Sequence, residues 1–88
     1  MKILIVEDER KTGEYLSMGL REAGYAVELL NNGVDGLHQA LEGDHDLVIL
    51  DVMLPGMDGW QVLRGLRAQG REMTVLFLTA KDPVDDRV

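Results

Sequence analysis

A short run of branched apolar residues that stops at a carboxylate constrains the fold of this chain more than any other feature. Leu47 to Leu50 are apolar in succession and suit a strand that is buried on both faces. The run ends at Asp51, and the residues that then prevent the strand from continuing are Pro55, Gly56 and Gly59. An aspartate at such a place commonly caps a turn. Asp51 becomes a candidate for chemistry if a second strand also ends on acid, because ligands bind at the carboxyl ends of strands in open α/β sheets.

Three further segments have the composition of strands, and one of them shares the acidic ending. Lys2 to Val6 predicts a second buried strand, and residues 7 to 9, which follow it, are all acidic. Thr74 to Leu78 predicts another buried strand. Tyr25 to Leu30 is less apolar, as expected of a strand at the edge of a sheet. Two strands of this chain therefore end on carboxylates.

The segments between these strands have helical periodicity and helix-end signals. The expected inward faces are Thr12, Leu16, Gly19, Leu20 and Ala23 in the first helix, and Val34, Leu37, Ala40 and Leu41 in the second. Four helices are predicted. The first runs from Glu9 to a stop at Gly24, and the second from a cap at Asn32 to Gly43. The third starts at a capping box of Asp58 and Gln61 and runs to about Gln69 with Gly70 as the stop, and the fourth begins at Asp82 and Pro83.

Strands that alternate with helices at this spacing predict βαβ units with right-handed crossovers and a parallel, doubly wound α/β sheet. The chain has 88 residues, of which 45% are hydrophobic and 28% charged, so we expect one small globular domain over residues 1 to 88. A signal peptide and a membrane-spanning stretch are absent from the sequence, which favours a cytoplasmic location. The net charge of −7 argues against a nucleic-acid surface on this segment.

Cysteine and histidine contribute no recognisable site to this sequence. The chain contains no cysteine, which excludes disulfides, thiolate metal sites and a cysteine nucleophile. His38 and His45 are isolated and lack the spacing of paired metal ligands. We expect both to be ordinary surface or half-buried residues.

The acidic strand ends predict a metal site if the two strands are neighbours in the sheet. Glu7, Asp8 and Asp51 would then crowd one pocket, where like charges are unfavourable unless a cation or protons neutralise them. A hard divalent ion such as Mg²⁺ fits such a carboxylate set. An ion there could draw in a phosphoryl group while Asp51 attacks the phosphorus, and the hydroxyl of Thr79 could donate to a phosphoryl oxygen. The alternative for Thr79 is a strand-end or capping role.

These residues resemble a known family, the receiver domains of two-component response regulators. The matching segments are VEDE at 6 to 9, DLVILDVMLPGMDGW at 46 to 60 and LTA at 78 to 80. VEDERKTGEYL together with GMDGW is similar to the winged-helix (OmpR/PhoB-like) transcription-factor branch, especially regulators that respond to copper and other heavy metals. The resemblance implies a flavodoxin-like sheet with strand order 2-1-3-4-5.

The resemblance also implies roles, position by position, for most of the residues singled out above. Asp51 would be the phospho-acceptor, Asp8 a direct Mg²⁺ ligand, and Glu7 a ligand directly or through water. Met53 would offer its backbone carbonyl as a Mg²⁺ ligand, and the hydroxyl of Thr79 would close on the phosphoryl group. Ala80 would be a small residue that leaves room beside the phosphoryl group. The residues that shape the loop would be Pro55, Gly56 and Gly59.

The family's fifth strand and last helix, with its lysine and aromatic switch residue, would lie beyond Val88, so the resemblance implies a receiver truncated at its C-terminus. It implies a regulatory domain and not an enzyme. The implied partners are a sensor histidine kinase, DNA through a C-terminal domain, and a second copy when phosphorylated, with no membrane partner.

The acidic strand ends are also compatible with other classes of protein. A dehalogenase-type phosphatase also uses a strand-end aspartate and Mg²⁺, but places a second acid where this chain has Met53. A flavodoxin-like FMN binder needs a phosphate loop where residues 7 to 9 would repel phosphate. A dinucleotide fold needs GxGxxG, which is absent. A stand-alone receiver that signals by protein contact is the remaining alternative.

Overall fold

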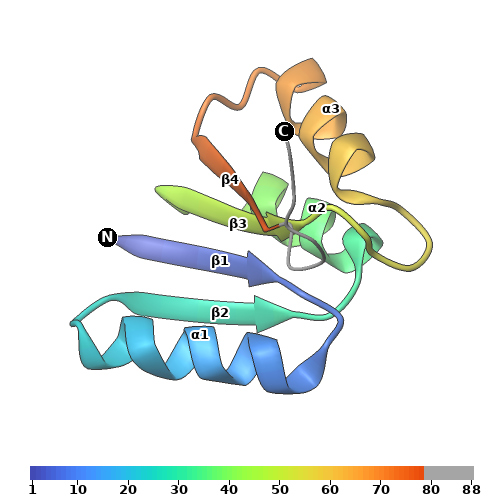
Figure 1. The fold of residues 1–88 in the computed structure, drawn as a ribbon. Helices are drawn as coiled ribbons and strands as arrows, with labels where there is room; N and C mark the ends of the chain where they lie inside the picture. The colour runs from blue at the N-terminus through green and yellow to red at the C-terminus, as the bar shows by residue number, and fades with distance from the viewer. Residues whose placement is uncertain (79–88) are drawn as a thin grey trace, which may run out of the picture.

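Strands and helices alternate through residues 1–78, the part of the chain that this computed structural model describes (Figure 1). The predicted elements up to Leu78 are all present, whereas Thr79, Ala80 and the helix expected from Asp82 lie outside the described residues. The elements are β1 (Lys2–Val6), α1 (Arg10–Glu22), β2 (Ala26–Leu30), α2 (Gly33–Glu42), β3 (Leu47–Asp51), α3 (Gly59–Ala68) and β4 (Thr74–Leu78).

The strands form one parallel sheet in the order β2-β1-β3-β4, which confirms the predicted doubly wound α/β fold. The less apolar strand β2 lies at an edge, as expected. β1 and β3 are neighbours, and Val6 pairs with Leu50 at their carboxyl ends. The residues that follow these two positions therefore emerge side by side at the same edge of the sheet.

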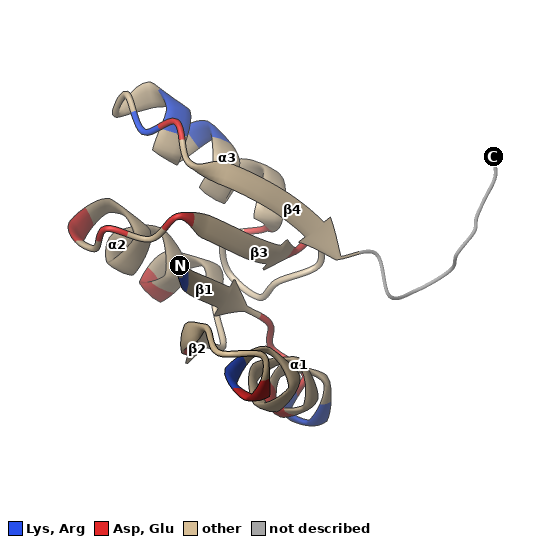
Figure 2. Ribbon diagram, turned by 90° about the vertical axis from the view of Figure 1, so that its left-hand side faces the viewer, with Lys and Arg blue, Asp and Glu red and all other residues tan. Residues whose placement is uncertain are grey.

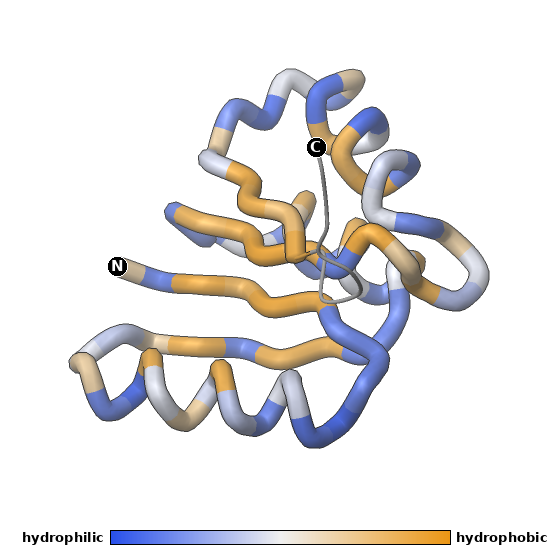
Figure 3. The backbone as a smooth tube through the Cα atoms, in the orientation of Figure 1, coloured by the Kyte–Doolittle hydropathy of each residue, from blue (hydrophilic) through white to orange (hydrophobic). Residues whose placement is uncertain are grey.

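Helices cover the two faces of the sheet unequally (Figure 1). Alternate strand residues such as Leu4, Val6 and Leu50 pack under α2 and α3. Ile3 and Ile5 belong to the opposite cluster, to which α1 contributes side chains. Figure 3 shows the strands as the most continuously hydrophobic part of the backbone. This double burial explains why β1 and β3 are apolar runs without alternation.

The predicted ends of the three helices within residues 1–78 are confirmed. Asn32 caps α2 by accepting a hydrogen bond from the amide of Asp35. Asp58 and Gln61 form a reciprocal capping box at the start of α3. Gly24 and Gly70 have φ values of 100° and 75° just after α1 and α3, where a side chain would be strained.

The inward face of α2 matches the prediction except at Val34. Ala40 is buried, and Leu37 and Leu41 pack against the core, as predicted. Val34 is 56% exposed, and the helix buries Gly33 and Gly36 as well. A Cβ atom on Gly36 would lie only 2.7 Å from Cγ2 of Val6. The helix backbone thus packs directly on β1, and its closest face consists of small residues, which a search for large apolar residues passes over.

The inward face of α1 was also predicted only in part. The predicted Leu16 and Leu20 pack against the core, and Gly13 and Ser17 are buried as well. The predicted Gly19 and Ala23 are exposed. A Cβ atom on Gly13 would lie 2.9 Å from a methyl group of Leu29. Here too, the small residue marks the line of closest approach between helix and sheet.

Two further predictions about burial were wrong. Leu76 in β4 is 51% exposed, because among residues 1–78 β4 has a strand on one side only and no helix packs over this side chain. His45 is 5% exposed and so is buried, whereas His38 lies on the surface as predicted. None of the helices in residues 1–78 is both long and apolar enough to cross a bilayer.

Candidate functional site

The ends of β1 and β3 bring three carboxylates together. Glu7 and Asp8 directly follow β1, and Asp51 is the last residue of β3. Figure 2 shows the acidic segment after β1. One carboxylate oxygen from each of the three residues lies within 4.8 Å of the others. The three residues differ in exposure: Glu7 is buried, Asp51 is half-buried and Asp8 is exposed.

Glu7 is fixed by backbone contacts on both sides. Its amide donates to the carbonyl oxygen of Leu30 at 2.9 Å, and its Oε2 accepts from the amide of Glu9 at 2.9 Å. Its Oε1 atom is buried and has no hydrogen-bond partner among residues 1–78. A buried acceptor without a partner is costly unless an ion or proton satisfies it.

The electrostatics of the cluster favour the neutral form of Glu7. The pKa of Glu7 is raised from 4.5 to about 7, and burial is the main cause. The hydrogen bond from the amide of Glu9 opposes this rise, and the nearby carboxylates of Asp51 and Asp8 contribute to it. The group that most needs a neutralising partner is therefore the innermost one.

This arrangement fits a hard divalent cation. All three side chains offer carboxylate oxygens, the ligands that Mg²⁺ prefers. The unpaired Oε1 of Glu7 is available for such an ion, and the ion's charge would relieve the repulsion among the three groups. The residues that could hold it are Glu7, Asp8 and Asp51.

The loop after Asp51 holds the carboxylate in place. Oδ1 of Asp51 accepts a hydrogen bond from the amide of Met53 at 3.0 Å. Gly56 has a φ of 79°, which favours glycine. The loop returns to the strand at Gly59, whose amide donates to the carbonyl oxygen of Val52 at 3.0 Å. A Cβ atom on Gly59 would lie 2.6 Å from the backbone oxygen of Asp51, so the loop passes against the strand end.

The structure places most of the predicted site residues but not all of them. Pro55 lies in the same loop, and its carbonyl oxygen accepts from the amide of Met57 at 2.9 Å. Met53 follows Asp51 by two residues and is 68% exposed, and its amide contacts Asp51, while its predicted role as a carbonyl ligand stays a prediction. Thr79 and Ala80 fall outside the described residues.

Two residues near the site were missed by sequence reasoning. The amide of Glu9 orients Glu7, and Arg10 lines a cavity of about 360 Å³ that Glu7 and Asp8 also line. Glu9 is part of the acidic run, but residue types do not show where its backbone amide points. Arg10 carried only a weak signal, because it is the first of two cations, Arg10 and Lys11, that directly follow that run.

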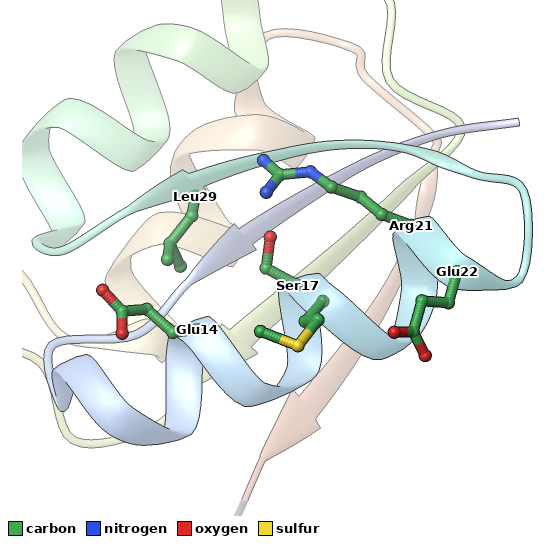
Figure 4. Close-up of a pocket in the computed structure, with 6 residues that line it drawn as sticks. Glu14, Ser17, Arg21, Glu22 and Leu29 are labelled. Atoms are coloured by element: carbon green, nitrogen blue, oxygen red, sulfur yellow. The ribbon is translucent and has the colours of Figure 1, made fainter.

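A larger cavity lies away from the acidic cluster. Its volume is about 560 Å³, and it lies between α1 and β2, where Ser17, Arg21 and Leu29 line it (Figure 4). Arg21 is already engaged, because its Nη2 donates to the carbonyl oxygen of Val27 at 3.0 Å. None of the three acidic site residues lines this cavity.

Comparisons with known proteins agree with this geometry. The model of the response regulator receiver domain family matches residues 3–88. The chain is 62% identical over 87 residues to the transcriptional regulatory protein PcoR of Escherichia coli, covering 99% of this chain and 38% of that protein. It is 54% identical to the transcriptional regulatory protein CusR of Escherichia coli K12, covering 100% of this chain and 39% of that protein. The chain thus spans less than two fifths of each relative.

A solved structure is also similar to this fold. The response regulator TrrA from Thermotoga maritima, in complex with Mg²⁺ and BeF, superposes with a TM-score of 0.85 at 37% identity. The match covers 90% of this chain and 69% of that one.

Proposed function

This chain belongs to the response regulator receiver domain family, and from that membership we propose that Asp51 accepts a phosphoryl group from a partner histidine kinase in a Mg²⁺-dependent reaction. The convergence of Glu7, Asp8 and Asp51 at one edge of the sheet is the observation that carries this proposal. Of the three, Asp51 is the half-buried one, and its Oδ1 accepts a hydrogen bond from the amide of Met53.

The proposed reaction is a transfer of one group to this chain. An oxygen of the Asp51 carboxylate attacks the phosphorus, and a phosphorus–oxygen bond forms as the bond between phosphorus and the donor nitrogen breaks. The electron pair of the broken bond remains on the donor imidazole. The chain is thus the acceptor of a signal, and we propose a regulatory role without turnover of a separate substrate.

Glu7, Asp8 and Asp51 would hold Mg²⁺, together with the backbone carbonyl of Met53. The ion would supply positive charge that attracts and screens the phosphoryl oxygens. The unpaired Oε1 of Glu7 supports this assignment. The similarity to TrrA, whose structure is a complex with Mg²⁺ and BeF, supports it independently.

Thr79 is proposed to donate its hydroxyl to a phosphoryl oxygen, with Ala80 leaving room beside it. The strand register supports this role, because Asp51 pairs with Leu78 across β3 and β4 and Thr79 is the next residue in the sequence. Pro55, Gly56 and Gly59 are proposed to shape the loop that carries Asp51 and Met53.

The output of the phosphorylated state is proposed to be transcriptional. The similarity to PcoR and CusR, both named as transcriptional regulatory proteins, supports this output. We further propose a C-terminal DNA-binding domain, dimerisation on phosphorylation and control of metal-resistance genes. A stand-alone receiver that signals by protein contact is the second candidate. The coding sequence beyond codon 88 separates the two, because only the first requires a winged-helix domain there.

Mass spectrometry after treatment of the complete protein with a small phosphodonor tests the central proposal. We expect one added phosphoryl group that depends on Mg²⁺ and is lost in Asp51→Asn. Asp58→Asn is a matched control, because Asp58 lies in the following turn and caps α3. Equal labelling of Asp51→Asn and the unmodified protein would show that another residue accepts the group.

A further inference from the structure

The edge strand β2 carries a charged side chain on the face that points toward the core. Glu28 pairs with Leu4 in the register, and Leu4 belongs to the cluster that packs under α2 and α3. The side chain of Glu28 is half-buried, at 43% exposed, so its carboxylate loses part of its water and gains from hydrogen-bond partners in the protein. Gln39 of α2 supplies one, with its Nε2 at 3.3 Å from Oε1 of Glu28.

The second partner of Glu28 is the buried histidine that sequence reasoning assigned no role. Nε2 of His45 lies 2.6 Å from Oε1 of Glu28, and the side chain of His45 is 0% exposed. Nδ1 of His45 is buried and has no partner among residues 1–78. A Cβ atom on Gly43 would lie 2.5 Å from Cε1 of His45, so the ring fits its slot only beside a glycine.

Other charged groups surround this pair, from each neighbouring element. Lys2 of β1 donates through Nζ to Asp44 at 3.1 Å and through its amide to Asp46 at 2.8 Å. Arg71, between α3 and β4, reaches the carbonyl oxygens of Leu41 and Gly43 at the end of α2. The turn that contains His45 is thus held from β1 and from the α3–β4 connection as well as from β2.

We propose that Glu28, His45 and Gln39 form a charge-dependent clasp that holds the edge strand β2 to the turn between α2 and β3, and that the clasp releases when Glu28 loses its charge. Nε2 of His45 donates to the ionised carboxylate. The neutral carboxyl group accepts this hydrogen bond less strongly, so the contact between Nε2 of His45 and Glu28 weakens. The hydrogen bond from His45 also holds the pKa of Glu28 below its ordinary value of 4.5, which accords with an ionised partner at neutral pH.

The clasp differs from an ordinary surface pair, and the chain contains a matched example of the latter. His38 and Glu42 on α2 form a second histidine–glutamate pair at 3.2 Å, but their side chains are 72% and 65% exposed. Exposed pairs contribute little because water and salt screen them. The two pairs have the same chemistry, but only the first has a buried member: the side chain of His45 is 0% exposed, whereas that of Glu28 is 43% exposed.

Double-mutant cycles on the complete protein at neutral pH test the clasp, with Glu28→Gln and His45→Gln compared with His38→Gln and Glu42→Gln. Glu28→Gln mimics the uncharged carboxyl group. We expect a coupling factor of roughly tenfold or more in the unfolding equilibrium constant for Glu28 and His45, because the His45 ring is fully buried. The exposed pair should couple by less than about fivefold. A buried coupling no larger than the exposed one overturns the proposal.

Nitrogen NMR of the His45 ring in the unmodified protein decides the question even if His45→Gln does not fold. We expect Nε2 to carry a proton at neutral pH. In Glu28→Gln, the proton on Nε2 should exchange with water markedly faster. An Nε2 atom without a proton in the unmodified protein, or unchanged exchange in Glu28→Gln, overturns the clasp.

Discussion

Glu7 is a carboxyl group that binds a proton more tightly in the folded chain than in the unfolded one. Its pKa is raised from 4.5 to about 7, with burial as the main cause and the neighbouring carboxylates as the next. Between these two pH values the folded state binds more protons than the unfolded state. The stability contributed by protonated Glu7 is therefore fully present below pH 4.5 and is lost as the pH rises through about 7.

Without divalent cations, the free energy of unfolding should fall between pH 4.5 and about 7 because of this group. One proton gives a slope of at most about 1.4 kcal/mol per pH unit. Denaturant unfolding at several pH values measures it. In Glu7→Gln the dependence of the free energy of unfolding on pH should be weaker over this range. An unchanged dependence would show that another group binds the proton.

Mg²⁺ binding should compete with the same proton. The apparent affinity for Mg²⁺ should rise with pH up to about 7, by at most about tenfold per pH unit for one displaced proton. Trp60, the only tryptophan, directly follows the Gly59 that packs against Asp51, so its fluorescence provides a titration signal. A signal change that persists when Asp8→Asn and Asp51→Asn are combined would place the ion elsewhere.

At the scale of the elements, small residues set how closely the helices approach the sheet. Gly36→Ala should destabilise the fold by about 1–3 kcal/mol, because the new methyl group would overlap the side chain of Val6. Denaturant unfolding measures the loss. Gly19→Ala in α1 is the matched control, since no atom lies within 4 Å of its added Cβ.

Gly19→Ala should raise stability by about 0.5–1 kcal/mol, because alanine favours helix more than glycine does. If Gly36→Ala and Gly19→Ala change the free energy of unfolding by the same amount, helix propensity and not packing determines the effect at Gly36.

Sequence periodicity predicted the elements well and their faces less well. The strand ends at Val6 and Leu78 and the cap at Asn32 follow from local residue order, which sequence reasoning can detect. The exposure of Val34 and the burial of His45 depend on contacts between elements. His45 contacts Glu28, which lies 17 residues away in the sequence. The residue pattern of a single segment cannot predict such a pair.

The candidate site was predictable to a similar extent. Two acidic strand ends and parallel topology were enough to expect Glu7, Asp8 and Asp51 together, and the structure brings them together. The raised pKa of Glu7 and its unpaired Oε1 depend on burial, which residue types alone do not give. The same topology places the carboxylates after the strand ends and the His45 turn before the start of β3, so the proposed phosphoryl chemistry and the proposed clasp are separate.

At the scale of the whole molecule, β4 is the weak boundary of the sheet. β4 is the last strand in the order β2-β1-β3-β4, so within residues 1–78 its outer edge has no partner strand. Leu76 in this strand is 51% exposed. Unpaired apolar edges recruit other chains, and even intact domains have only about 5–15 kcal/mol of stability.

A polypeptide of these 88 residues alone should therefore self-associate through β4, exchange elements between copies or remain partly molten. Intact mass confirms the length, and light scattering over a range of concentrations measures the association. Leu76→Lys should reduce it, because a charge on an edge strand opposes pairing with another chain. Met18→Lys is the control, since Met18 is similarly exposed, at 60%, but lies on α1. A sharp, concentration-independent monomer with cooperative thermal unfolding would show that residues 1–88 already protect this edge.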